Sequence, residues 1–475
     1  FITTLNDWLS LPGNDSLSKA IRLSESLPSE LSKKEAEMKE SFGSKIMEAA
    51  AWYGERWRYY NEKASECAKL REFKTAAYWD HMKEKWSEQL LIEQFPKLGL
   101  IPSYTFPVNN IQLEVLTGES GDRNKNPWDR EIQLNRDARL GISEYVPGAR
   151  VIAGGRMWES YGVGRYPKHF MATQLYFLCP ECNNVEVYQS LDDVPSKCRA
   201  CGAHIEKIKI RAFIEPKSFV TSAEKPNGET PDLVRLKPPP SQESRLLGGA
   251  ADDAFTSTKI SDITWAYQNS IEGKMFIVNK GYGEGYIRCG CGYAKAVKRG
   301  QLQKIMKDKH KTPYGEHCKK PFWENKGKPE DFAHVYNTDT LQIRFNRTLP
   351  PPPPELTDEE KSQWTHSMCV TLVEAIRLGA IRLINIDQRE LSGTYRLHAG
   401  IPEVILYDST PGGAGYCTML QSCDIQSLLD AACFKLECKN ECSNSCRSCL
   451  QSYDNQILWD FLRRKPILKW LKEFK

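Results

Sequence analysis

The sequence predicts a multidomain α+β protein, with a helical N-terminal part, a β-rich zinc-ribbon part and a mixed α/β C-terminal zinc-binding domain. Three observations predict it: a length of 475 residues, which suggests about three domains; a helical front rich in aromatic residues; and cysteine pairs among strand-like segments. Hydrophobic residues are 40% and charged residues 27% of the chain, an ordinary globular balance. No run of 18 apolar residues occurs, so no membrane partner is expected.

Composition and pattern divide the chain into four regions. Residues 1–95 are rich in helix-forming residues, and aromatic side chains at helical spacing indicate a core, with base stacking as the alternative. Residues 96–220 are β-rich around a zinc ribbon. Residues 221–355 begin with a linker rich in proline and glycine and continue as a β-rich basic region. Residues 356–475 form the α/β domain.

Local signals are clearest in this last region. Thr357, followed three residues later by a glutamate, predicts the start of a helix. Strands are expected at 381–386 and 404–407. The second strand leads into the glycine-rich turn 408–415 and then into a helix. Strand, glycine-rich turn and helix form a geometry that can cradle phosphate, with a tight structural turn as the alternative.

The chain has sixteen cysteines. A chain of this length without a secretory signal uses such cysteines as metal ligands in the reducing cytoplasm rather than as disulfides. Cys179 and Cys182 form one CxxC pair and Cys198 and Cys201 a second, fifteen residues later. This spacing predicts a Cys₄ zinc ribbon, flanked by strands at 175–178 and 205–210. Four thiolates leave no open position, so the zinc is structural.

Two further cysteine clusters follow. Cys289, Cys291 and Cys318 with one histidine would form a Cys₃His site. We prefer His310 to His317, because ligands at adjacent positions 317 and 318 would strain the geometry; the alternative is a pair of surface histidines on a basic loop. The third cluster is a compact Cys₄ site of Cys438, Cys442, Cys446 and Cys449. The expected cofactor is Zn²⁺, at two or three structural sites.

Positive charge is concentrated between residues 281 and 328, which hold twelve Lys or Arg and four Asp or Glu, although the whole chain has a net charge of only +4. Such a block indicates a nucleic-acid surface or a solvated face. Aromatic residues among it, Tyr282, Tyr286, Tyr293 and Trp323, could stack on bases. The candidate phosphate contacts are Lys295, Lys298, Arg299, Lys304, Lys307, Lys309 and Lys311.

No catalytic residues are predicted, because the sequence lacks a GxxxxGK[ST], an HExxH and a GxSxG motif. A weaker hypothesis is a phosphodiesterase centre at His334, Asp339 and Asp408. The chain begins with Phe1 and is expected to be a segment of a longer protein.

Several segments together resemble the MrfA-like zinc-binding family, a domain at the C-terminus of bacterial superfamily 2 DEAD/DEAH-box DNA helicases. The resemblance covers residues from about 90 to 460, and the Cys289-x-Cys291 spacing departs from it, since relatives usually have two residues between these cysteines. The segments that carry it are 100–107, 145–149, 213–219, 333–341, the helix from Trp364, the turn 407–415, the last four cysteines and 450–455.

The resemblance implies a DNA-engaging accessory region of an ATP-dependent helicase whose motor lobes lie outside this chain. Relatives include DNA-repair helicases and helicases of anti-phage defence systems such as Druantia and DISARM, and the long helical front is most similar to the defence type. DNA is the expected partner, together with other subunits of a defence or repair system, and the expected location is cytoplasmic. The alternative is a zinc-stabilised docking module that recruits those subunits.

Overall fold

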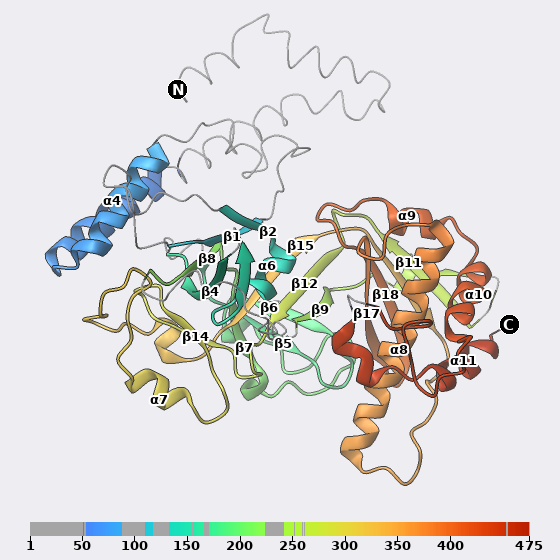
Figure 1. The fold of residues 1–475 in the computed structure, drawn as a ribbon. Helices are drawn as coiled ribbons and strands as arrows, with labels where there is room; N and C mark the ends of the chain where they lie inside the picture. Colours follow the sequence, from blue (N-terminus) through green and yellow to red (C-terminus); the bar gives the residue numbers. More distant parts are fainter. Residues whose placement is uncertain are drawn as a thin grey trace, which may run out of the picture.

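The computed structural model describes residues 51, 54–87, 110–116, 133–153, 156–165, 171–223, 242–250, 252–258, 260, 262–452 and 455–474. Over these ranges the chain forms a helical hairpin, two five-stranded sheets, a closed barrel and a small two-stranded module (Figure 1). The α+β class and the multidomain architecture are confirmed. The helix expected before residue 51, the segment 100–107 and most of the proline-rich linker lie outside the described residues.

The helical hairpin consists of a helix over residues 54–69 and α4 (Phe73–Ser87). Its turn contains Arg71, whose φ of 59° lies in the left-handed region. Tyr60, Trp79 and Trp86 are buried between the helices, and the rings of Tyr60 and Trp79 stack with centroids 5.7 Å apart. These three members of the aromatic stripe therefore form core.

The first five-stranded sheet follows the hairpin. Its strands are antiparallel except for the parallel pair β1–β8. α6 (Ala138–Glu144) begins directly after β2, where the carboxylate of Asp137 accepts a hydrogen bond of 2.9 Å from the backbone N–H of Arg139. In spatial order the strands are β2 (Gln133–Asp137), β1 (Asn110–Glu114), β8 (Ser218–Thr221), β4 (Arg156–Val163) and β3 (Arg150–Ala153).

A closed six-stranded barrel lies at the centre of the chain (Figure 1). Tyr176, Phe213 and Phe276 pack ring against ring in its interior. The barrel contains strands from both sides of residue 220, the predicted boundary between the second and third regions. These two regions therefore share one barrel, and the four-region division stays a prediction. In order around the barrel the strands are β12 (Lys274–Asn279), β15 (Asp331–Asn337), β7 (Arg211–Ile214), β5 (Gln174–Leu178), β6 (Val185–Tyr188) and β9 (Gln242–Leu247).

Between β12 and β15 the chain forms a small module, residues 281–328, which we call the basic module. It contains β13 (Tyr286–Arg288), β14 (Ala294–Ala296), α7 (Leu302–Lys307) and the 3₁₀ turn η6 (Glu324–Gly327). The apolar cluster that lies wholly within this module has three buried residues, Ile287, Val297 and Ile305. A core this small needs another source of stability.

The second five-stranded sheet belongs to the C-terminal part and is antiparallel throughout. β17 and β18 are joined by Ala399 and Gly400, with φ of 51° and 83°, as a tight two-residue hairpin requires. In spatial order the strands are β10 (Thr256–Ser257), β11 (Ile263–Gln268), β16 (Thr340–Phe345), β18 (Ile401–Asp408) and β17 (Leu391–His398). The 3₁₀ turn η5 (Asp252–Ala254) precedes β10.

Helices cover this sheet (Figure 1). The predicted capping box is present, since the side chains of Thr357 and Glu360 each accept a hydrogen bond from the other's backbone N–H. Gly379 of the long helix α8 allows close contact with α10, because a Cβ there would lie 2.7 Å from the backbone nitrogen of Ala432. The helical elements are α8 (Asp358–Ile384), α9 (Tyr416–Gln421), α10 (Ile425–Leu436), η7 (Gln456–Phe461) and α11 (Arg464–Lys472).

Three sequence expectations were wrong. Residues 381–384 continue α8, which ends at Asn385 in the left-handed conformation, so the expected strand 381–386 does not form. Residues 205–210 hold only the 3₁₀ turn η4 (Lys207–Lys209), with Ile208 88% exposed. The linker expected over residues 222–253 contains strand β9. Short apolar runs fit helix and strand equally well, which explains the first error.

The described helices include none that is both long and apolar enough to cross a membrane.

Candidate zinc centres and basic surface

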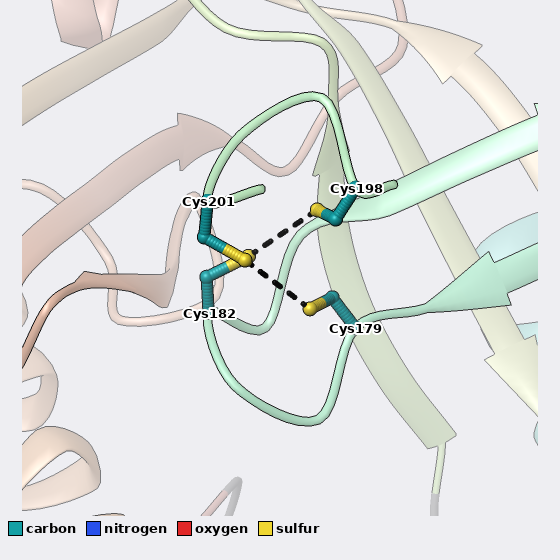
Figure 2. Close-up of side chains that lie close together, drawn as sticks. All are labelled: Cys179, Cys182, Cys198 and Cys201. Carbon is teal, nitrogen blue, oxygen red and sulfur yellow. Dashed lines mark hydrogen bonds between the residues drawn. The ribbon is translucent and has the colours of Figure 1, made fainter. Parts of the chain in front are cut away.

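The first cysteine cluster lies at one end of the barrel, between β5 and β6 and in the loop after η3 (Leu191–Asp193). Its four sulfurs face one another (Figure 2). The Sγ atoms of Cys179 and Cys201 are 3.6 Å apart, and those of Cys182 and Cys198 are 3.7 Å apart. Three of the four side chains are buried and Cys201 is exposed. The two CxxC pairs thus form the single ribbon that their spacing predicts.

Backbone N–H groups approach the sulfurs of this ribbon. Burial opposes ionisation of Cys201, but the N–H of Ala203 and the neighbouring thiols lower its pKa below the ordinary value. Gly202, at φ +74°, provides the turn that presents this N–H. Burial is the main cause that raises the pKa of Cys179 to about 11. Burial and the local N–H groups thus act in opposite directions on the pKa values of the thiols in this cluster.

The ribbon also joins the barrel to the C-terminal sheet. The backbone N–H of Leu397 in β17 donates to the carbonyl of Cys182 at 2.9 Å. The side chain of Asn183 donates to the carbonyl of Tyr395 at 3.0 Å and accepts from the Arg245 guanidinium at 3.0 Å. The loop that holds two cysteines is therefore part of the contact between the two β structures.

The second cluster lies in the basic module and contains three cysteines and one histidine. The Sγ atoms of Cys289 and Cys318 are 3.9 Å apart, and Cys291 Sγ lies 3.4 Å from Nε2 of His310. His310 is buried, whereas His317 is exposed and is not among the four. The structure thus brings together the four residues that we preferred.

Aromatic rings hold the His310 imidazole in place. Tyr293 stacks on it with centroids 4.6 Å apart, and Trp323 lies 5.2 Å away on a tilted plane. The knuckle formed by Cys289, Cys291 and the following Gly292 is attached to β4, because the N–H of Val163 donates to the carbonyl of Gly292 at 2.9 Å. Packing therefore restricts the orientation of one ligand before a metal binds.

The third cluster follows α10 and contains four cysteines. The Sγ atoms of Cys438 and Cys446 are 3.4 Å apart, and those of Cys442 and Cys449 are 3.7 Å apart. Burial works against ionisation of Cys438, but the backbone N–H groups of Cys442 and Asn440 lower its pKa to about 6. A thiolate already present near neutral pH favours metal binding.

Buried polar contacts attach this third cluster to the helices of the C-terminal part. Arg464 at the start of α11 donates to the carbonyls of Cys442 at 2.8 Å and Leu436 at 3.1 Å. Asn455, just after the cluster, donates to the carboxylate of Glu374 in α8 at 2.9 Å. The cysteine loop is therefore tied to α8, α10 and α11.

All three clusters fit zinc in donor set and in size. Zinc takes four thiolate or imidazole ligands tetrahedrally, with zinc–sulfur distances of about 2.3 Å, which places ligand sulfurs about 3.8 Å apart. The sulfur–sulfur distances across the clusters are 3.4–3.9 Å. In each cluster the four ligand atoms lie within 4.8 Å of one another. The predicted cofactor, zinc at two or three structural sites, is confirmed.

The seven predicted phosphate-binding residues all lie between the metal-ligand candidates Cys291 and His310 or directly after His310. Six of them are exposed, and Lys311 is half-buried. Lys295 is on β14, and Lys304 and Lys307 are on α7. In the described parts of the chain none of the six exposed residues forms an ion pair. Their role in binding nucleic acid stays a prediction.

The structure separates the four aromatic candidates for base stacking. Tyr286 is fully buried, and Tyr293 and Trp323 pack around His310. Tyr282 alone of the four is open to solvent, at 61% exposed, and the Lys298 ammonium lies 4.8 Å from its ring centroid. Phe322, which the sequence analysis did not single out, is 58% exposed and lies beside Gly290, between the ligand candidates Cys289 and Cys291. An aromatic residue within a basic segment was the only signal that could have identified it.

The glycine-rich turn contains no open phosphate cradle. The carboxylate of Asp408 accepts hydrogen bonds from the backbone N–H groups of Ala414, Tyr416 and Cys417 at 2.8, 3.0 and 2.9 Å. A phosphate would have to displace this carboxylate. The structural-turn alternative therefore explains the motif.

The hypothetical phosphodiesterase centre is not assembled. Asp408 and Asp339 are neighbours, and the charge of Asp408, after burial, raises the pKa of Asp339. His334 instead lies 3.2 Å from the carboxylate of Glu215. Among the described residues, none of the three belongs to a group of potential metal ligands.

Comparison with known families identifies the class of the C-terminal part. Residues 372–450 match the MrfA Zn-binding domain, and the third cysteine cluster lies inside this range. The chain therefore carries a zinc-binding domain of the MrfA type, and the resemblance recognised in the sequence is confirmed.

The chain is also similar to Druantia protein DruE of Escherichia coli (strain UMEA 4076-1). The two are 24% identical over 419 residues, which cover 80% of this chain and 22% of DruE. A crystal structure of the DUF1998 helicase MrfA bound to DNA matches 78% of this chain and 34% of MrfA, with 12% identity and a TM-score of 0.36. A second, bound to DNA and AMPPNP, matches 78% and 33%, with 10% identity and a TM-score of 0.28. The chain thus spans about a fifth of DruE and a third of MrfA.

Proposed function

We propose that this chain is a DNA-engaging accessory region of an ATP-dependent helicase of bacterial anti-phage defence, acting in the cytoplasm. The motor lobes would lie outside the chain, whose sequence has no nucleotide-binding motif of its own. The MrfA Zn-binding domain at 372–450 and the similarity to Druantia protein DruE support the helicase and defence parts of this proposal.

The observation that carries the DNA-binding part is the basic module. Its lysines project from a segment that begins after Cys291 and reaches to His310, so two metal ligands fix its ends. Six exposed cations that form no ion pair within the described residues are available for phosphates. Neutralising phosphates releases condensed counterions, which makes such a surface an effective and salt-dependent DNA contact.

We further propose that each of the three clusters holds one structural zinc through the twelve residues named above. The apolar cluster of the basic module has three buried residues. A zinc ion there would supply the stability that a larger apolar core would otherwise provide. A bound ion would cross-link the module there, while the buried side chain of Ile305 leaves the lysines of α7 facing outward.

Fluorescence anisotropy with labelled single-stranded and duplex DNA, measured over a salt series on the 475-residue chain, tests the DNA contact. The variant Lys298→Gln/Lys304→Gln/Lys307→Gln should bind more weakly. It should also lower the magnitude of the salt slope by about 2 for single strands and about 3 for duplex DNA, because three phosphate contacts are lost.

A matched control removes the same charge elsewhere. Lys197, Lys207 and Lys274 are exposed and lie outside the basic module. The variant Lys197→Gln/Lys207→Gln/Lys274→Gln should keep the wild-type salt slope. Equal slopes in all three proteins would exclude the basic module as the DNA contact.

A further inference from the structure

The loop from His310 to Lys319, here called the ligand loop, makes two kinds of contact at once. At its base it holds two residues of the second cluster, His310 and Cys318, whose backbones are joined by a hydrogen bond of 3.1 Å from the N–H of Cys318 to the carbonyl of His310. Its tip packs on the helical hairpin, more than 220 residues earlier in the chain.

Two charged side chains of the ligand loop bind the two helix ends that meet in the hairpin turn. The Glu316 carboxylate accepts hydrogen bonds from the N–H and hydroxyl of Thr75 at 3.2 and 2.5 Å, and from the N–H of Lys74 at 3.3 Å. The two backbone N–H groups belong to the first turn of α4, where backbone donors have no acceptor within the helix. The Lys319 ammonium donates to the carbonyls of Leu70 and Arg71 at 2.7 and 3.3 Å.

The signs of these charges suit the helix ends. A carboxylate stabilises the N-terminus of a helix and a cation its C-terminus. Glu316 therefore acts as a capping residue for α4, and Lys319 acts as one for the end of helix 54–69. The backbone of the turn already closes helix 54–69 with bonds from the N–H of Arg71 to the carbonyl of Ala68 and from the N–H of Glu72 to that of Cys67, and the ligand loop adds its two side-chain contacts to these.

Between these two polar contacts lies an aromatic one. Tyr314 at the tip of the ligand loop is only 3% exposed, with its ring centroid 4.3 Å from Tyr78 and 5.9 Å from Trp79. Tyr314 is part of the same buried cluster as the two hairpin helices. The hairpin thus closes its core with a residue of the ligand loop.

Apart from the two ligands at its base, the ligand loop is held from outside by the N–H of Ala223, which donates to the carbonyl of Pro313 at 2.8 Å, and by the hydroxyl of Tyr161, which donates to the carbonyl of Lys311 at 3.2 Å. Its described internal backbone bonds are the closing bond at its base, the bridge between Lys311 and His317, the bond from Thr312 to Glu316, and the turn at Gly315. We propose that zinc at the second centre controls docking of the helical hairpin: bound metal fixes the ligand loop in the shape that caps both helices, and metal loss releases the hairpin. This inference rests on the zinc proposed for that centre.

Hydrogen exchange read by mass spectrometry on the full chain, with zinc counted on the same samples, tests the coupling. Cys318→Ser removes one ligand of the second centre. We expect it to lose one zinc and to raise amide exchange in residues 54–69 and 73–87 at least ten-fold, while the barrel strands stay protected. Cys201→Ser is the matched control, because it removes an exposed ligand of the first centre and should leave hairpin exchange unchanged.

The possible results separate the two proposals. Equal zinc content in wild type and Cys318→Ser would overturn the second zinc centre itself. Loss of one zinc with an unchanged hairpin would overturn the coupling and leave the centre standing. Equal release of the hairpin in Cys201→Ser would also overturn the coupling.

A reciprocal variant decides the case in which Cys318→Ser unfolds more widely. Glu316→Ala/Lys319→Ala keeps all four ligands but removes both helix caps. Because coupling between two sites acts equally on both binding equilibria, this variant should bind zinc at the second centre at least several-fold more weakly than wild type, as measured by competition with a chelator. An unchanged zinc affinity would overturn the coupling.

Discussion

The carboxylate of Asp408 lies 2.9 Å from the backbone nitrogen of Cys417, at the first turn of α9, and accepts its hydrogen bond. The same carboxylate accepts two further backbone N–H groups of the glycine-rich turn. A side chain from the end of β18 thus provides, from within the protein, the negative charge that a bound phosphate would provide in a nucleotide site. The turn is a structural corner between sheet and helices.

This contact predicts a stability cost for Asp408→Asn. An amide keeps only one acceptor oxygen and turns its NH₂ toward a backbone N–H, so the variant should lose about 2–3 kcal/mol of unfolding free energy. Urea unfolding measures it. Asp387→Asn is the control, because Asp387 is exposed and accepts the N–H of Arg389 within its own turn. An equally small effect for both would contradict a buried supporting role.

Glu403 in β18 predicts a pH-dependent contribution to stability. It is fully buried, and its carboxylate accepts from the Arg344 guanidinium at 3.0 and 3.1 Å. Burial alone would raise its pKa, but His398, Arg396 and Arg344 lower it below the ordinary value of 4.5. A lowered folded-state pKa stabilises the protein above the unfolded pKa, and this stabilisation is lost as pH falls through the folded pKa.

Glu403→Gln should therefore destabilise the chain by about 3 kcal/mol at pH 7, because it leaves buried cations without their partner. The difference from wild type should shrink below about pH 4, where the wild-type carboxyl itself becomes protonated. Urea unfolding of both proteins at pH 7 and pH 3.5 measures this, and zinc loss at low pH affects both alike. A gap that stays constant with pH would argue against an ionised Glu403.

The sequence was a good guide where a local pattern is sufficient. The capping box at Thr357 marks the start of α8. The sequence was a poor guide at the end of α8, because the apolar run 381–384 fits a buried helix as well as a strand. The sheet order joins β11 and β16 to β18 far along the chain, and no local pattern encodes such pairing.

For the site, ligand spacing grouped the two Cys₄ clusters, because their cysteines are close in sequence, whereas the choice of His310 for the second cluster needed the argument that adjacent ligands strain the geometry. The contact of Glu316 with Thr75 could not be predicted. The two residues are 241 positions apart, and a glutamate in a basic loop resembles any solvated charge. Exposure of Tyr282 rather than Tyr286 was equally out of reach, because both follow glycines in one short segment.

Gly162 predicts a steric effect at the attachment of the basic module. A Cβ at this position would lie 2.0 Å from the carbonyl oxygen of Gly292, a backbone atom that cannot rotate away. Gly162→Ala should push the knuckle from β4 and cost at least about 2 kcal/mol of unfolding free energy. Gly54→Ala is a control of opposite sign. It lies in a helix with its nearest atom 3.9 Å away, and it should stabilise by about 0.5–1 kcal/mol.

Tyr282 predicts a preference for single strands within the proposed DNA contact. Its ring is exposed beside the Lys298 ammonium, so it can offer a face to an unpaired base while the lysine holds a phosphate. Tyr282→Ala should weaken binding of single-stranded DNA by about 1–3 kcal/mol and change duplex binding much less, because bases in a duplex are already stacked.

Anisotropy at one salt concentration, with both kinds of DNA, measures the effect of Tyr282→Ala. Tyr282→Phe keeps the ring and should bind as wild type does, which separates stacking from a contact of the hydroxyl. Phe434→Ala removes a ring of similar exposure from α10, outside the basic module, and should have no effect. If Tyr282→Ala weakened duplex and single-stranded binding equally, the ring would serve the shape of the basic module rather than a base, since only stacking distinguishes the two kinds of DNA at this position.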